Sequence, residues 1–265
     1  WPGSSSGTYV LLHGYGDCGR TLELLVDALP QTWRIIAPDW RGFGDSEWTD
    51  HGYWFPDYLA DLDSIIELKG CARPVNLIGH SMGGNVAAFY AGIHPTKVRR
   101  LAVLEGFGLR DTRPAEAADR YAKWLGQVAA RRPSRQFESV EQIAGSVRKR
   151  YPDLRHDLAL YAARHRSRRE ADAWVLKSDP THQWINPVLY RRSEAAACWQ
   201  RITAPVLTVS AADSPFAGGE AEFAPHLEAA DDYHHEHLPE VGHMFHLQAP
   251  QLLAEKLTHF FQESP

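Results

Sequence analysis

The stretch VNLIGHSMGG, residues 75–84, places a serine between a buried strand and a helix. Its first four residues are apolar except for one asparagine, which is typical of a strand covered on both faces. The pattern G-x-S-x-G follows at once, and a helix-forming run over 85–93 comes next. Glycines around Ser81 allow a sharp turn that exposes the hydroxyl at the amino end of the helix. The stretch therefore predicts that Ser81 is a nucleophile.

The rest of the chain repeats this alternation of strand and helix. Segments of helical length separate short apolar runs, and this alternation is typical of βαβ units with a buried parallel sheet. We therefore expect an α/β fold with a mostly parallel central sheet flanked by helices. The runs expected to form strands are 8–12, 33–37, 75–78, 101–104, 205–210 and, near the carboxyl end, 234–238.

Residues 109–201 differ from the segments on either side. Their apolar residues recur at helical spacing only, which predicts a helical cap inserted into a core made of 1–108 and 202–265. Ser139, with Gln142 three residues later, predicts the start of one of its helices. The insert holds 19 Lys+Arg and 11 Asp+Glu, against 9 and 22 elsewhere. This basic excess is typical of solvated helix faces, and an anion-selective site is the alternative.

Composition excludes several classes of function. A chain of 265 residues suits one α/β domain, with or without an insert. A net charge of -5 argues against nucleic acid as a partner, and no apolar stretch approaches the roughly 18 residues of a membrane span. Three widely spaced cysteines predict no disulfide framework and favour the cytoplasm. The chain opens with Trp rather than Met, so we expect a trimmed amino terminus, from which a signal peptide could have been removed.

A serine hydroxyl needs a base, and the base needs an orienting carboxylate. Among 14 histidines, His243 follows the last expected strand and precedes a helix expected over 251–261, so we expect it to be the base. His246 is the alternative, although helix packing is its expected role. Three histidines within 234–237 alternate along a strand and therefore face opposite sides, so we expect no metal site there.

These motifs resemble the α/β-hydrolase fold family. Besides residues 79–84, the sequence HGYG at 13–16 matches the family's oxyanion loop, and DWRGFGDS at 39–46 resembles its Asp-x-Arg-Gly-x-Gly-x-Ser loop. The resemblance implies a serine hydrolase, carboxylesterase-like, with a cap at the position of the insert. It also implies that the backbone N–H groups of Tyr15 and Met82 form the oxyanion hole.

Two residues are candidates for the carboxylate. Asp213 follows the strand expected at 205–210 and gives the order Ser, Asp, His along the chain, so it is our expected acid. Glu105 ends the strand before the insert, where relatives such as the haloalkane dehalogenases place an acid, and it is the alternative.

The residue at position 81 also limits the chemistry. A serine there disfavours the alkyl-enzyme chemistry of dehalogenases and epoxide hydrolases in this family and leaves acyl transfer. We expect a carboxylic ester hydrolase that acts on a small-molecule ester without cofactor or metal. A lactonase, thioesterase or C–C bond hydrolase with the same triad is an alternative, and so is a ligand receptor on the same fold. Aromatic residues of the insert could line an acyl pocket: Trp124, Trp174, Trp184, Tyr190 and Trp199.

Overall fold

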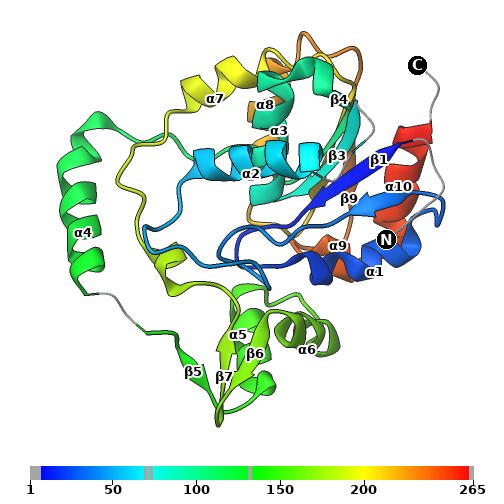
Figure 1. Ribbon diagram of the computed structural model, residues 1–265. Helices are drawn as coiled ribbons and strands as arrows, with labels where there is room; N and C mark the ends of the chain where they lie inside the picture. Colours follow the sequence, from blue (N-terminus) through cyan, green and yellow to red (C-terminus); the bar gives the residue numbers. More distant parts are fainter. Residues whose placement is uncertain (1–6, 69–70, 72–73, 131–132, 263–265) are drawn as a thin grey trace.

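The computed structural model describes residues 7–68, 71, 74–130 and 133–262 and has a six-stranded sheet at its centre (Figure 1). All its pairings are parallel, in the order β2-β1-β3-β4-β8-β9. The expected α/β fold is thereby confirmed, and each expected run contains a strand. The strands are β1 (Thr8–Leu12), β2 (Arg34–Ile36), β3 (Val75–His80), β4 (Val98–Leu104), β8 (Val206–Ala211) and β9 (Tyr233–Leu238).

Helices cover both faces of this sheet. Successive side chains of a strand point to opposite faces, so Val10 and Leu12 of β1 join one apolar cluster while Tyr9 and Leu11 join the other. The first cluster lies beneath α2 (Phe55–Leu68), α3 (Met82–Ile93) and α7 (Arg192–Trp199), and α8 (Gly219–Phe223) adds Phe223 to it. The second lies beneath α1 (Glu23–Ala28) and α10 (Pro250–Gln262), beside the short elements η1 (Gly19–Leu22) and α9 (Phe245–Gln248).

The segment between β4 and β8 is not helical throughout, which corrects our expectation. It contains a small antiparallel sheet in the order β5-β7-β6, beside which α5 and α6 pack (Figure 1). These strands are only two to four residues long, too short for an alternating apolar pattern to be recognised. The elements are η3 (Pro114–Glu116), α4 (Ala117–Ala129), β5 (Gln136–Phe137), α5 (Val140–Arg150), α6 (His156–His165), β6 (Ser167–Glu170), β7 (Ala173–Leu176), η4 (Pro180–Gln183) and α7.

The start of α5 agrees with its sequence signal. The Ser139 hydroxyl accepts a hydrogen bond from the N–H of Gln142 at 3.3 Å, as expected of an N-cap. The Gln142 side chain accepts from the N–H of Glu138 at 3.1 Å, one residue before the position that a capping box uses.

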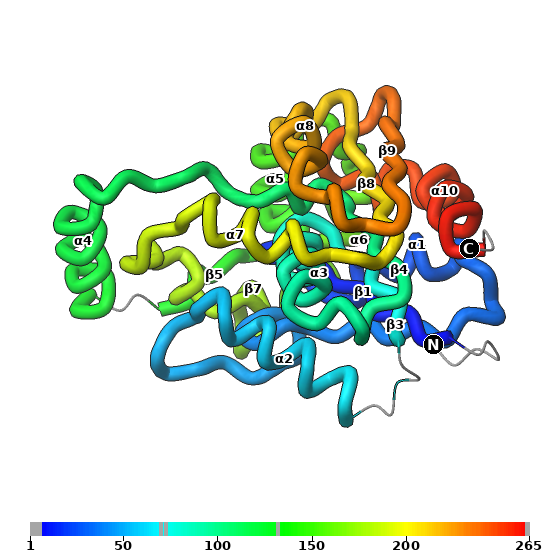
Figure 2. Tube along the Cα trace, turned by 90° about the horizontal axis from the view of Figure 1, so that it is seen from above, coloured from blue at the N-terminus to red at the C-terminus, as the bar shows by residue number. Residues whose placement is uncertain are grey.

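Helix α4 stands apart from the rest of the molecule (Figure 2). None of its residues is buried, and Leu125 is 59% exposed. Its polar side chains hold the segment after η4: Arg120 donates to the carbonyl of Asn186 at 3.0 Å, and Gln127 accepts from the N–H of Ile185 at 2.8 Å. Among the described residues, no helix combines the length and apolar character that crossing a membrane requires.

Candidate active site

The nucleophile predicted from sequence lies at a strained turn. Ser81 separates β3 from α3 and has φ 54° and ψ -116°, a conformation that costs a non-glycine residue free energy. Its N–H donates to the carbonyl of Leu104 at 2.8 Å, and its carbonyl accepts from the N–H of Asn85 at 3.0 Å. The predicted strand–turn–helix geometry is therefore present, with the half-buried Ser81 side chain at its apex.

The glycines of the motif are required by close backbone contacts. A Cβ on Gly79 would lie 2.3 Å from the carbonyl oxygen of Gly83, and one on Gly83 would lie 2.2 Å from that of Leu12. Both distances are far below van der Waals contact, so only glycine permits α3 to begin this close to β1 and β3.

His243 and Glu105 form a buried pair in the segments that follow β9 and β4. The Nδ1 of His243 lies 2.6 Å from Glu105 Oε2, and the two side chains are 4% and 0% exposed. The N–H of Ala211 donates to Glu105 Oε1 at 3.0 Å, and the Ser214 hydroxyl donates to Oε2 at 2.7 Å. An ionised carboxylate only accepts, so Nδ1 carries a proton, and in the neutral ring Nε2 then keeps the lone pair.

The structure does not bring Asp213, our expected acid, into contact with His243. Asp213 is exposed, and its carboxylate has no hydrogen bond or ion pair with any residue that the structure describes. After β8 ends, the N–H of Ser214 donates to the carbonyl of Ala211 at 3.3 Å, and this turn directs Asp213 outward and Ser214 inward. Glu105, the alternative, occupies the position beside His243.

His80, which the sequence analysis did not single out, joins the turn at Ser81 to the base. Its Nε2–H donates to the backbone carbonyl of His243 at 2.8 Å, and the two ring centroids are 4.6 Å apart. Burial lowers the pKa of His80 well below its usual value, and the neighbouring imidazoles of His246 and His243 add to this effect. The ring is therefore neutral. Its only sequence signal is its position in the motif, immediately before the serine.

Aromatic rings from two segments flank His243. Tyr151 of the insert stacks on His243 with centroids 6.0 Å apart, and Phe216, after β8, lies 4.6 Å from it. The Ser81 hydroxyl has no hydrogen bond to any described residue. Hydrogen bonds between a catalytic serine and its base are often long before substrate binds, so the bond between Ser81 and His243 stays a prediction.

The predicted oxyanion loop lies against the nucleophile. The N–H of Asp17 donates to the carbonyl of Gly14 at 3.2 Å, closing a turn in which Gly16 has φ +71°. A Cβ on Gly14 would lie 3.1 Å from the Cβ of Ser81. Met82 is the first residue of α3, where a backbone N–H has no acceptor within the helix. The roles of the Tyr15 and Met82 amides stay predictions.

His246, the alternative base, lies beside a different carboxylate. Its Nε2 is 3.5 Å from Asp17 Oδ2, and both side chains are almost fully buried. Burial would raise the pKa of Asp17, but the contact with His246 and the positive charge of Arg166 hold it well below the usual value. The carboxylate also accepts from the Thr21 hydroxyl at 2.6 Å. This arrangement ties α9 to the oxyanion loop.

The histidines of β9 have partners other than a metal. His235 bonds to the hydroxyls of Thr208 and Ser210 at 2.9 and 3.2 Å, and His234 pairs with Asp232 at 2.6 Å. Within the described part of the chain, no group of three or more His, Cys, Asp or Glu side chains could hold a metal ion.

The aromatic residues of the insert do not share one environment. Trp199 is fully buried, with its ring 4.9 Å from that of Phe223, so it cannot line a pocket. Trp174 packs against the apolar cluster that α5 and α6 form with Met244 and Leu247, whereas the ring of Trp124 lies 6.4 Å from that of Trp54.

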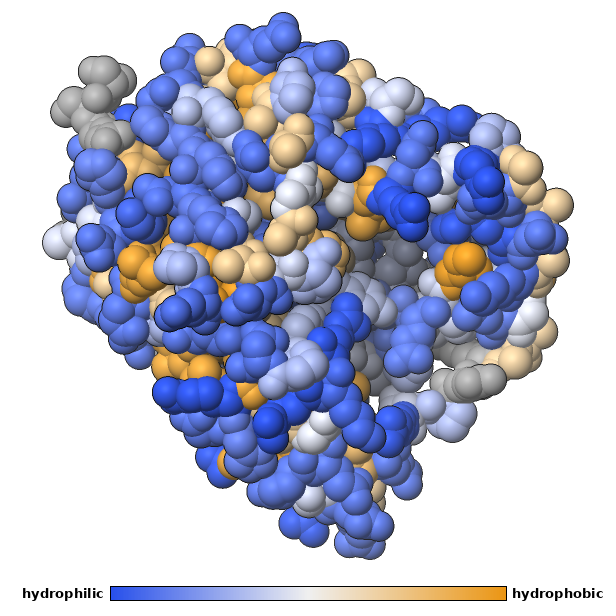
Figure 3. Space-filling view, turned by 180° about the vertical axis from the view of Figure 1, so that it is seen from behind, coloured by the Kyte–Doolittle hydropathy of each residue, from blue (hydrophilic) through white to orange (hydrophobic). Residues whose placement is uncertain are grey.

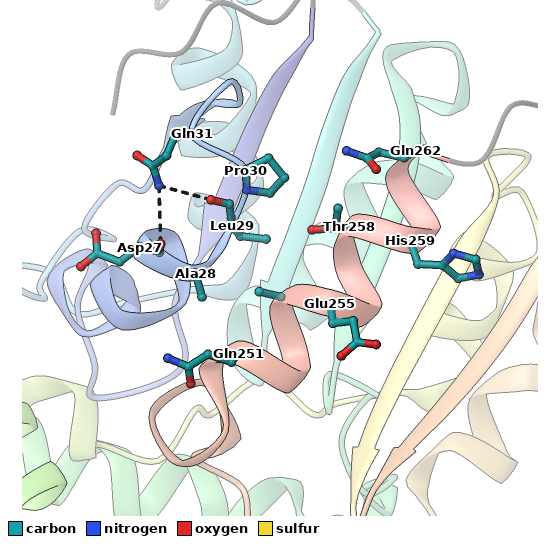
Figure 4. Close-up of a pocket in the computed structure, with 11 residues that line it drawn as sticks. Asp27, Ala28, Leu29, Pro30, Gln31, Gln251, Glu255, Thr258, His259 and Gln262 are labelled. Carbon is teal, nitrogen blue, oxygen red and sulfur yellow. Dashed lines mark hydrogen bonds between the residues drawn. The ribbon is translucent and has the colours of Figure 1, made fainter.

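The surface has two hollows, at different places relative to the candidate site residues. One, of about 670 Å³, lies between α1 and α10 and contains none of the candidate site residues (Figure 4). Figure 3 shows another, between the main body and the arm that carries α4, within a largely hydrophilic face.

Comparison with known proteins agrees with the observed fold. A family model described as the alpha/beta hydrolase fold matches residues 9–250. The chain is 38% identical over 122 residues to a serine hydrolase-like protein of Danio rerio, covering 45% of this chain but only 36% of that protein. It is 28% identical over 219 residues to a 3-hydroxybutyrate-oligomer hydrolase of Cupriavidus necator, covering 77% and 72% of the two chains. A hypothetical protein of Pseudomonas aeruginosa PAO1 shares the fold, with a TM-score of 0.86, 24% identity, and 98% and 94% coverage.

Proposed function

The chain belongs to the α/β-hydrolase fold family, and from this premise we propose that it is a serine hydrolase that cleaves small carboxylic esters through an acyl-enzyme. The observation that carries the proposal is the 2.6 Å hydrogen bond between His243 and Glu105, next to the turn that exposes Ser81. A buried carboxylate that fixes the tautomer of a histidine beside a strained serine is the arrangement that nucleophilic catalysis requires.

The proposed reaction begins with the substrate carbonyl beside Ser81. His243 Nε2 takes the hydroxyl proton while the Ser81 oxygen bonds to the carbonyl carbon, and the amides of Tyr15 and Met82 donate to the oxygen that gains charge. The intermediate collapses as the bond to the alcohol breaks, and His243 returns the proton to the leaving oxygen. Glu105 stabilises the imidazolium throughout.

The second half of the reaction repeats these steps with water. His243 takes a proton from water, the resulting hydroxide attacks the acyl carbon, and the bond to Ser81 breaks with return of that proton. The carboxylic acid is released and the serine is restored. The proposed steps require no cofactor.

Residues of the cap contact the segment that carries His243. A Cβ on Gly242 would lie 2.0 Å from Asp153 Oδ2, so the loop between α5 and α6 lies directly on the residue before His243. Asp153 also accepts from Gln248 at 2.9 Å. Together with the stacking of Tyr151, these contacts support a role for the cap in enclosing the acyl-enzyme.

A substrate panel tests the proposal. We expect nitrophenyl esters of short and medium acids to be turned over with higher kcat/KM than matched lactones and thioesters, and Ser81→Ala to abolish all turnover. A fluorophosphonate should label one site per chain rapidly. Slow labelling without turnover would indicate a receptor, and preferred cleavage of lactones or thioesters would replace the ester assignment.

A further inference from the structure

Arg166 lies where the cap meets the oxyanion loop. It follows the last residue of α6, and its Nη2 is 3.4 Å from the position that a Cβ on Gly16 would take. Gly16 follows Tyr15, whose amide is one of the two predicted oxyanion donors. A guanidinium from the insert therefore lies directly against the loop that the proposed reaction uses.

This guanidinium is mostly buried, yet its Nε–H has no acceptor among the described residues. The Arg166 side chain is 16% exposed, and its Nε has no hydrogen-bond acceptor among the described residues. The Oδ1 of Asp17 forms an ion pair with Arg166 at 4.0 Å from Nε, which is too far for a hydrogen bond, and it already accepts from the Cys18 amide and the Thr21 hydroxyl. A guanidinium presents five N–H donors, and burying it is unfavourable unless an anion pairs with it.

A second positive charge lies nearby. Arg150 ends α5, and its guanidinium carbon is 5.6 Å from the ring of Tyr151, which stacks on His243. Its charge also acts on Tyr15, where it opposes the larger effect of burial, which raises the pKa of that phenol. The basic excess of the insert is thus not confined to solvated faces, because Arg166 is mostly buried against this loop, whereas Arg150 is exposed.

We propose that Arg166, assisted by Arg150, binds a carboxylate of the substrate, so that the favoured esters carry a negative charge besides the bond that is cleaved. The inference rests on the proposed function and names the substrate class of the same site. A guanidinium binds a carboxylate through paired, charge-assisted N–H bonds, and this geometry distinguishes it from a lysine ammonium. The carboxylate can belong to the acyl part or to the alcohol part of the ester.

The wild-type chain allows a first test with two pairs of esters. Nitrophenyl hydrogen glutarate against its methyl ester varies charge on the acyl part, and acetoxybenzoate against its methyl ester varies charge on the alcohol part. In one pair we expect kcat/KM to be higher for the charged member by about tenfold or more, mainly through KM. The pair that shows the preference identifies the part that Arg166 binds.

Variants then assign the preference to its residue. Arg166→Gln should remove the preference, because kcat/KM falls at least tenfold more for the charged member than for the neutral ester, and Arg166→Lys should keep part of it. Arg164→Gln is the matched control, because Arg164 lies on the same helix turn but is exposed. It should leave both rates unchanged.

The outcomes separate this inference from the proposed function. If the wild type cleaves neutral esters but shows no preference for the charged member of either pair, the carboxylate site is overturned and the hydrolase remains. An equal loss for charged and neutral esters in Arg166→Gln would reduce Arg166 to a counterion of Asp17 and would also overturn the inference. Failure to cleave any of the four esters would overturn both.

Discussion

At the scale of single residues, the sequence identified the proposed nucleophile and base but did not decide which carboxylate orients the base. Ser81 and His243 were predicted because their motifs have fixed places in the order of strands. The carboxylate was not, because Glu105 and Asp213 both follow strands that end at the same edge of the sheet. The direction of each side chain depends on the turn that follows the strand, and sequence spacing does not specify that turn.

Replacing each candidate carboxylate tests which one orients the base. Glu105→Gln leaves an amide beside Nδ1 that can stabilise the wrong tautomer, so we expect kcat to fall by about 10⁴-fold. Asp213→Asn changes an exposed side chain and should leave kcat within about twofold of wild type. The measurement is kcat with nitrophenyl acetate for both variants. A larger loss for Asp213→Asn would restore our original expectation.

His80 allows a test of how the base is held. His80→Leu removes the N–H that donates to the carbonyl of His243, and an unsatisfied buried carbonyl costs about 1–3 kcal/mol. We expect the free energy of unfolding to fall by that amount in urea and kcat to fall with it. His51→Leu, an exposed histidine, is the control. If His80→Leu kept wild-type stability and kcat, this hydrogen bond would not position His243.

At the scale of elements, α4 shows where a helical pattern predicts a helix but not its burial. Tyr121, Leu125 and Val128 recur at helical spacing, and α4 forms there, yet all three side chains are at least 39% exposed. In α5 the same spacing places Ile143 in the core of the cap at 1% exposure. Amphipathic spacing indicates that a helix has an apolar side, but a partner surface decides whether that side is covered.

The contrast between α4 and α5 gives a prediction about stability. Leu125→Gln should change the free energy of unfolding by less than about 0.5 kcal/mol, because the side chain is already 59% exposed. Ile143→Ala should cost about 2–5 kcal/mol, because it leaves a cavity in the cap core. Urea unfolding of both variants checks this. A large loss in Leu125→Gln would mean that α4 packs against another surface in solution.

The element η4 carries His182, a titratable residue of the insert that contacts residues of the core. The His182 ring stacks between Phe43 and Tyr53, with centroids 3.8 and 3.6 Å away. Burial lowers the pKa of His182 to about 4 against the opposing effect of Asp179. Between its unfolded pKa of 6.5 and its folded pKa of about 4, the unfolded chain binds the extra proton. Stability from the neutral ring is therefore complete above pH 6.5 and is lost as pH falls toward 4.

This link predicts an acid sensitivity that His182→Gln should reduce. For the single group, the free energy of unfolding should fall by about 2 to 3 kcal/mol between about pH 7 and about pH 4.5. The same fall should be smaller in the variant by up to that amount. Urea unfolding at the two pH values measures the difference. An identical fall in wild type and variant would contradict the role of His182.

At the scale of the whole molecule, the parallel sheet and the positions of its strands along the chain were accessible from sequence, because short buried runs bounded by turns leave a clear periodic signal. The insert was less accessible. Its β5–β7 sheet is too short to show alternation, and α7 packs on α3 through Trp199 although it lies inside the segment assigned to the cap. The arm carrying α4 and the hollow beside it depend on contacts between distant segments, which local patterns do not encode (Figure 3).

The central claim is that Ser81 carries the acyl group, and trapping that intermediate tests it most directly. Acid quenching during turnover of nitrophenyl acetate, followed by mass spectrometry of the peptides, should find the acetyl group on the peptide that contains Ser81. The adduct should be absent in Ser81→Ala and should form far more slowly in Glu105→Gln. Ester cleavage with no adduct, or with the acetyl group on another residue, would contradict the account.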